Sequence, residues 1–132
     1  MSQWTHICGC IRFDALRGMV GMPFSTLNAV KEHMGKTFCY DDDENKWDDC
    51  NVPCGSEGSI QFVFYESPDM SSIAAYTVAV WGDLRDFGSK EDIETVKKWF
   101  NSVTKGEGVM VRNAILEIDI DGKDHTILRH ED

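Results

Sequence analysis

The sequence predicts a single α+β domain, and three observations lead to this prediction. Two segments repeat their apolar residues at helical spacing, while five others show the alternation or the β-branched runs of strands. Short turns rich in glycine, proline or aspartate separate these segments. The 132 residues are enough for one hydrophobic core but too few for two, so residues 1–132 are expected to form one domain.

The first predicted strand is the segment 4–14. One side of it would carry Thr5, Ile7, Gly9, Ile11 and Phe13, and the other Trp4, His6, Cys8, Cys10 and Arg12. Successive side chains of a strand point to opposite faces, so only the first set is expected to face the core. His6, Cys8, Cys10 and Arg12 would then line an open sheet face, which such a fold leaves free for a ligand or a second subunit.

A short helix follows a glycine-containing turn. Ser25 is its expected N-cap, Leu27, Val30 and Met34 recur at helical spacing, and Gly35 is the expected residue after the C-cap. The helix is therefore amphipathic, with one apolar side for the core.

The next two strands are predicted at 59–65 and 73–81, joined by a turn, as an antiparallel hairpin. The segment 73–81 is almost entirely apolar or β-branched, which is typical of a central strand covered on both faces.

The strongest helix signal begins at Ser89, which is expected to cap the helix together with Asp92 three residues later. Its apolar stripe consists of Ile93, Val96, Phe100 and Val103. Gly106 and Gly108 end it.

Two strands, 109–120 and 126–129, complete the chain around an Asp121-Gly122 turn. The order β-α-β-β-α-β with an extra C-terminal strand indicates a ferredoxin-like sandwich, in which two helices cover one face of an antiparallel sheet. Another small α+β arrangement is the alternative, and neither fold fixes a function.

Residues 41–59 form an acidic and glycine-rich insertion. Between Asp41 and Asp49 six acidic residues accompany one lysine, a net charge of -5 out of -10 for the whole chain. An indole ring among these charges is costly unless it packs on the core or anchors a partner, and aromatic residues are enriched at binding hot spots. The expected partner-binding residues are Asp41, Asp42, Asp43, Glu44, Trp47, Asp48 and Asp49. The alternatives are a solvated loop and a divalent-cation site, although the spacing of an EF-hand is missing.

The overall charge restricts the partner. A net charge of -10 disfavours free nucleic acid and anionic membranes, because phosphate groups are bound by clustered Lys and Arg. A protein with a basic surface is the better match. The N-terminus has neither the cationic start nor the apolar run of a signal peptide, so we expect a cytoplasmic protein.

The glycine-rich part of the insertion suggests a second site. Its backbone N–H groups, together with an indole and two guanidinium groups elsewhere, would suit a small nucleotide. This alternative ligand-binding set is Gly55, Ser56, Gly58, Trp81, Arg85 and Arg112. The competing interpretation is a tight turn at the glycines and an ion pair between Arg85 and Asp83 or Asp86.

The five cysteines are expected to be reduced thiols, because their number is odd and no secretion signal is present. A zinc site made by Cys8, Cys10, Cys50 and Cys54 is a weaker alternative, with His6 or Cys39 as substitutes. A thiol nucleophile at Cys50 or Cys54 with His33, His125 or His130 is weaker still, since no base and oxyanion donors converge. We expect no catalytic residue, no metal and no cofactor.

Two sequence motifs resemble small uncharacterised proteins of phage and prophage genomes. They are Trp4-Thr5-His6 with the strand Ile11-Arg12-Phe13-Asp14, and the stretch Asn51-Val-Pro-Cys-Gly-Ser-Glu-Gly58. The resemblance implies a non-enzymatic protein that disables a host defence or nucleic-acid-processing protein in the host cytosol. The alternative function is a sponge that sequesters a small nucleotide signal between subunits.

Overall fold

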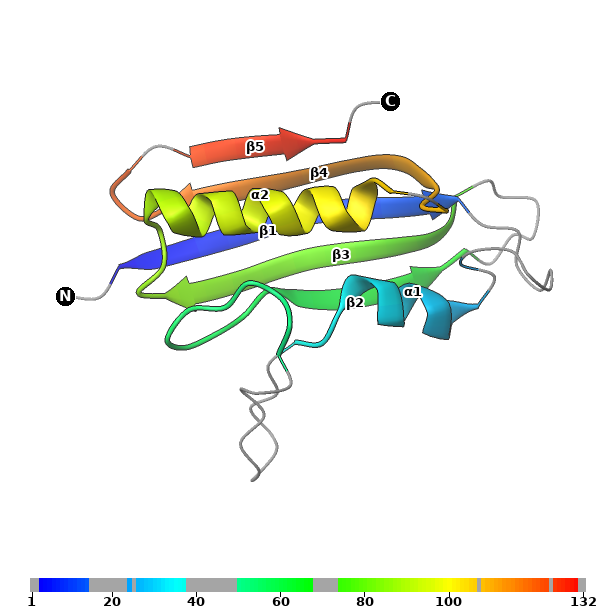
Figure 1. The fold of residues 1–132 in the computed structure, drawn as a ribbon, viewed down its shortest axis with the longest axis horizontal. Coiled ribbons are helices and arrows are strands. Elements are labelled where there is room, and N and C mark those ends of the chain that lie inside the picture. The colour runs from blue at the N-terminus through cyan, green and yellow to red at the C-terminus, as the bar shows by residue number, and fades with distance from the viewer. Residues whose placement is uncertain are drawn as a thin grey trace, which may run out of the picture.

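The structure is a computed structural model that describes residues 3–14, 24, 26–37, 50–67, 74–106, 108–123 and 125–130. Its elements are β1 (Trp4–Asp14), α1 (Leu27–Met34), β2 (Gln61–Glu66), β3 (Ala74–Arg85), α2 (Lys90–Thr104), β4 (Val111–Ile120) and β5 (His125–Arg129). The strands form one antiparallel sheet in the order β2-β3-β1-β4-β5 (Figure 1). The predicted α+β class, with an antiparallel sheet and a further C-terminal strand, is confirmed.

Both helices lie on one side of the sheet, α2 along β1 and β4 and α1 near β2 (Figure 1). The side chains on this covered face form one buried cluster with the apolar stripes of the helices. Ile11, Val78 and Leu116 supply its sheet side and are completely buried, and Val96 of α2 is equally buried against them. The sheet therefore has one covered face and one open face.

Strand β1 is the central strand, and its alternation is the one that the sequence predicts. Ile7, Ile11 and Phe13 are buried, whereas Cys8 and Arg12 between them are exposed. Hydrogen bonding to β3 on one side and to β4 on the other fixes which residues lie level with each other across the sheet.

Helix α2 begins with the predicted capping box. The Ser89 hydroxyl accepts a hydrogen bond from the Asp92 amide at 3.1 Å, and the Asp92 carboxylate accepts from the Gly88 and Ser89 amides at 2.9 and 3.0 Å. Partial burial alone would raise the pKa of Asp92, but these hydrogen bonds outweigh it and lower the pKa. The capping box therefore starts α2 directly after the connection from β3, and the helix then runs along the strands (Figure 1).

The N-cap of α1 differs from the prediction by one residue. Thr26 occupies the position, with its hydroxyl accepting from the Ala29 amide at 3.2 Å, and Ser25 lies outside the described residues. Both residues carry a capping hydroxyl, so local sequence does not distinguish them.

Strand β3 corrects two predictions. It continues past Trp81 to Arg85, so this segment belongs to the sheet and is not a loop before α2. It also has only one covered face, because both helices lie on the same side; Trp81 on the other face is 49% exposed. The predicted segment 73–81 is thus an inner strand whose apolar residues face the helices on one side of the sheet and the open face on the other.

Candidate functional site

The open face of the sheet carries an unusual amount of apolar surface. Among the described residues the exposed large hydrophobic side chains are Val63, Tyr65, Trp81, Ile115 and Ile127. The strand registers place all of them on this face, since Val63 pairs with Ala79, and Trp81 pairs with Cys8. They are 40 to 58% exposed. Together they form an apolar band that crosses the sheet from β2 to β5.

The two ends of this band carry opposite charges. At one end Asp83, His6 and Asp119 lie level on β3, β1 and β4, and Asp121 follows directly after β4. We call Asp83, Asp119 and Asp121 the acidic end. At the other end Arg12 lies on β1, and Arg129 lies on β5 opposite Ile115. These two arginines are the basic end of the open face.

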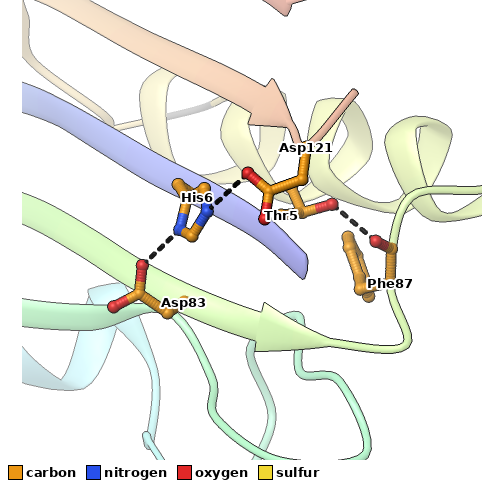
Figure 2. Close-up of polar contacts among 5 residues, drawn as sticks. All are labelled: Thr5, His6, Asp83, Phe87 and Asp121. Atoms are coloured by element: carbon orange, nitrogen blue, oxygen red, sulfur yellow. Dashed lines mark hydrogen bonds and ion pairs between the residues drawn. The ribbon is translucent and has the colours of Figure 1, made fainter. Parts of the chain in front are cut away.

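His6 joins three segments at the acidic end (Figure 2). Its Nδ1 is 2.6 Å from Asp83 Oδ1 and its Nε2 is 3.0 Å from Asp121 Oδ1. The hydrogen bond to Asp83 is the largest of the effects that raise the pKa of His6; slight burial opposes them, and Asp121 adds to them. An imidazolium ring donates from both nitrogens, which satisfies both carboxylates. Both ring nitrogens are therefore engaged by carboxylates, an arrangement that favours the protonated ring and leaves neither nitrogen free to act as a general base.

Thr5 holds the same end of β1 in place on the covered face of the sheet. Its buried hydroxyl donates to the Phe87 carbonyl at 2.5 Å, which ties β1 to the connection between β3 and α2 (Figure 2). The acidic end is thus fixed on both faces of the sheet. The alternation of β1 predicts His6 on the open face but does not identify its carboxylate partners. The signal that points to them is an aspartate near the end of each neighbouring strand, Asp83 in β3 and Asp121 after β4.

The acidic segment, residues 41–49, lies outside the described residues, and so do all seven predicted partner-binding residues. The described residues that precede and follow it are joined to each other. The Asn51 amide donates to the Lys36 carbonyl at 3.0 Å, and the Lys36 amide donates to Asn51 Oδ1 at 2.6 Å. Gly35 permits this approach, because a β-carbon there would lie 2.6 Å from Asn51 Oδ1 and its φ is 108°. Lys36 and Asn51, the described residues on the two sides of this part of the chain, are therefore held next to each other.

The glycine loop, residues 55–59, binds to the end of β3. The Ser56 amide donates to the Arg85 carbonyl at 2.8 Å, and the Arg85 amide donates to the Glu57 carbonyl at 2.9 Å. The Arg85 guanidinium also pairs with Glu57 at 2.6 Å, a partner that the sequence did not predict. A β-carbon on Gly55 would lie 2.2 Å from the Arg85 carbonyl oxygen. The loop is a turn that packs by its backbone on β3, because its glycines leave room for the strand.

The alternative ligand-binding set is not gathered in one place. Gly55, Ser56 and Arg85 meet at one end of β3, while Arg112 pairs with Asp14 at 3.2 Å at the far end of the sheet. Trp81 lies on the open face, level with Cys8. The six residues therefore form no common pocket.

The four cysteines that the structure describes fall into two separate pairs. Cys8 is exposed and Cys10 half-buried on the open face, whereas Cys50 packs against the core cluster of the helix side, and Cys54 lies in the same segment. Burial raises the pKa of Cys10 and of Cys54; Arg12 partly offsets this at Cys10, and the neighbouring Cys50 thiol adds to it at Cys54. A raised pKa leaves less thiolate at neutral pH. In the described parts of the chain no group of three or more His, Cys, Asp or Glu side chains is placed to hold a metal ion.

The histidines proposed as partners of a thiol lie elsewhere. The His33 ring bonds the Val103 carbonyl at 2.8 Å and packs edge-on against Phe13 and Phe24. His125 is exposed on the open face, opposite Asp119. His33 is accordingly a packing residue that links the two helices.

Comparison of the chain with protein-family models, with curated proteins and with solved structures gives no match. None of the described helices is long and apolar enough to cross a membrane.

Proposed function

We propose that the protein is a non-enzymatic, phage-type binding protein. Its acidic segment occupies a basic surface on a host defence or nucleic-acid-processing protein and thereby antagonises that protein. The observation that carries the proposal is the pair of hydrogen bonds between Lys36 and Asn51, which join the described residues that precede and follow the segment. Binding residues are commonly found on loops that a rigid scaffold positions.

The charge of the chain supports this kind of target. Residues 41–49 contribute a net -5, half of the total of -10. Potentials of opposite sign steer two proteins together and set their register, and they repel partners of like charge. An acidic surface of this density competes with the nucleic acid that a basic surface would otherwise bind.

The scaffold that we propose for this role is ferredoxin-like, with β5 as an addition to the sheet. Two features support the proposal: the element order from β1 to β4, and the position of both helices on one face. Within one copy of the chain the residues of the nucleotide-sponge alternative lie at opposite ends of the sheet, so a nucleotide pocket would require residues from two copies.

The direct test is neutralisation of the acidic segment. Tagged wild-type protein is expressed in host cells, and copurifying proteins are quantified by mass spectrometry at low and at high salt. The test variant changes Asp41, Asp42, Asp43 and Asp48 to Asn; the control variant changes Glu91 and Glu94 on the outer side of α2 to Gln. We expect one defined partner with the wild type and the control, and its loss with the test variant.

Salt distinguishes a charged contact from an apolar one. Exposed charges are screened over roughly 8–10 Å at physiological ionic strength, so recovery of the partner should fall as salt rises. Equal recovery with the quadruple variant, or recovery that does not change with salt, would show that the acidic segment is not the contact.

A further inference from the structure

We propose that the open face of the sheet is the interface of a homodimer, in which two copies stack their sheets with the strands of one copy antiparallel to those of the other. The acidic end of each copy then lies over the basic end of its partner. None of the residues from which we infer this dimer lies in the segment 41–49. The test of the dimer is therefore independent of the test of the proposed function.

The apolar band is the first observation. Within the described residues every exposed large hydrophobic side chain lies on this face, on β2, β3, β4 and β5. Apolar patches of this kind mark interaction surfaces in small proteins. No described helix covers the face, because α1 and α2 pack on the other one (Figure 1).

The face is large enough for a stable contact. Strands about 4.8 Å apart that rise roughly 3.3 Å per residue give the five strands a combined face of about 700 Å². Stable interfaces bury around 800 Å² per partner. A second sheet of the same size would cover most of the apolar band.

The charges indicate how the second sheet is oriented. Asp83, His6 and Asp119 form one level across the sheet, and Arg12 lies three alternate positions further along β1. We place a two-fold axis perpendicular to the strands, midway between the row of residues that contains Cys8 and the row that contains Cys10. Rotation about this axis places the row of His6 in one copy over the row of Arg12 in the other. It also brings Glu117 of one copy next to Arg129 of the other. Arg12 of one copy then lies over His6 of the other, between the carboxylates of Asp83 and Asp119 on the neighbouring strands, so opposite charges meet at both ends.

The other two-fold arrangement is unfavourable. An axis along the strands would stack the acidic end on the acidic end and Arg12 on Arg12, and facing like charges cost free energy. A foreign protein with a basic surface would suit the acidic end but not the two arginines. A second copy is complementary to both ends, as an isologous interface requires.

Charge reversal tests the arrangement with the full chain. One variant changes Arg12 and Arg129 to Glu, which places glutamates against the partner's carboxylates. The other changes Glu117 and Asp119 to Lys, which places lysines against the partner's arginines. Each variant alone should sediment as a monomer under conditions in which the wild type is a dimer. An equimolar mixture should recover the dimer mass, because the two variants are complementary to each other at both ends.

The matched control is Lys90→Glu with Lys98→Glu on the exposed side of α2, away from the open face. It changes the net charge by the same amount as the arginine variant. It should remain dimeric. A wild type that is monomeric at several hundred micromolar would overturn the proposal. So would charge-reversed variants that still form dimers alone, or a mixture that stays monomeric while both variants keep the wild-type circular dichroism spectrum.

A second measurement needs no substitution. Cys8 is exposed at the centre of the open face, so a maleimide should label it readily in dilute protein. Labelling of Cys8, followed by peptide mass spectrometry, should slow at least tenfold as the concentration rises through the dimer range. An unchanged rate across that range would contradict a contact over the centre of the face.

Discussion

The two faces of this sheet are built from the same strands and differ in what their side chains do. On β4, Ile115 is 40% exposed and the next residue, Leu116, is completely buried. On β3, Val80 is buried against the helices and Trp81 is half exposed on the other side. The covered face therefore supplies the stability of the domain, while the open face can carry apolar and charged residues chosen for contact with another molecule.

The largest expected difference between the faces is the loss in free energy of unfolding caused by truncating two neighbouring residues of β4. Leu116→Ala should lower the free energy of unfolding by about 3 kcal/mol, because it removes buried methyl groups and leaves a cavity. Ile115→Ala should change it by less than about 1 kcal/mol, since its side chain is already partly in water. Urea denaturation in dilute protein, below the range of any dimerisation, measures both; equal losses would show that the open face also belongs to the core.

On β3 the two faces can be compared by substitutions that enlarge a side chain instead of truncating it. The segment Ser59–Ile60 crosses β3 at Gly82, where a β-carbon would lie 2.8 Å from the Ser59 carbonyl oxygen and 3.1 Å from the Ile60 Cα. Gly82→Ala should therefore cost about 1–3 kcal/mol of stability, as overpacking does.

The matched variant is Ala79→Val, three residues earlier on the open face. Its added methyl groups face solvent, so the free energy of unfolding should change by less than about 0.5 kcal/mol. If Gly82→Ala melts at the wild-type temperature, the segment before β2 does not pack on β3 as described.

Sequence patterns identified the elements but not the difference between the two faces. The alternation of β1 and the capping box of α2 involve residues within a few positions of each other, so local sequence was enough to predict them. The apolar run at 73–81 was compatible with cover on one face or on two. Only the position of both helices decides between these possibilities, and that position depends on how the entire chain packs.

The functional groups depend on contacts that are still more distant along the chain. His6 meets Asp83 and Asp121 across 77 and 115 residues, and Arg85 finds Glu57 across 28. A local pattern therefore suggested nearby partners for Arg85 and none for His6. The strand registers bring these pairs together, and a single sequence gives the registers only approximately.

The smallest expected effect is the pH dependence contributed by His6 at the acidic end. The hydrogen bond to Asp83, supported by Asp121, raises the pKa of His6 above the ordinary histidine value of 6.5. A raised pKa means that the folded state binds the proton more tightly than the unfolded chain. The resulting stabilisation is fully present below pH 6.5 and is lost as the pH rises through the higher pKa of the folded state.

The test compares wild type with His6→Gln in dilute protein at pH 5.5 and at pH 9. The wild type should be more stable than the variant at pH 5.5, and the difference should shrink by pH 9. Because the His6 side chain is 42% exposed, solvent screens the interaction and the difference should be modest. Titration of the His6 ring by NMR gives the midpoint directly, and Asp83→Asn should lower it. A midpoint at or below 6.5, or a difference in stability that grows with pH, would mean that the two carboxylates do not hold His6 as a cation.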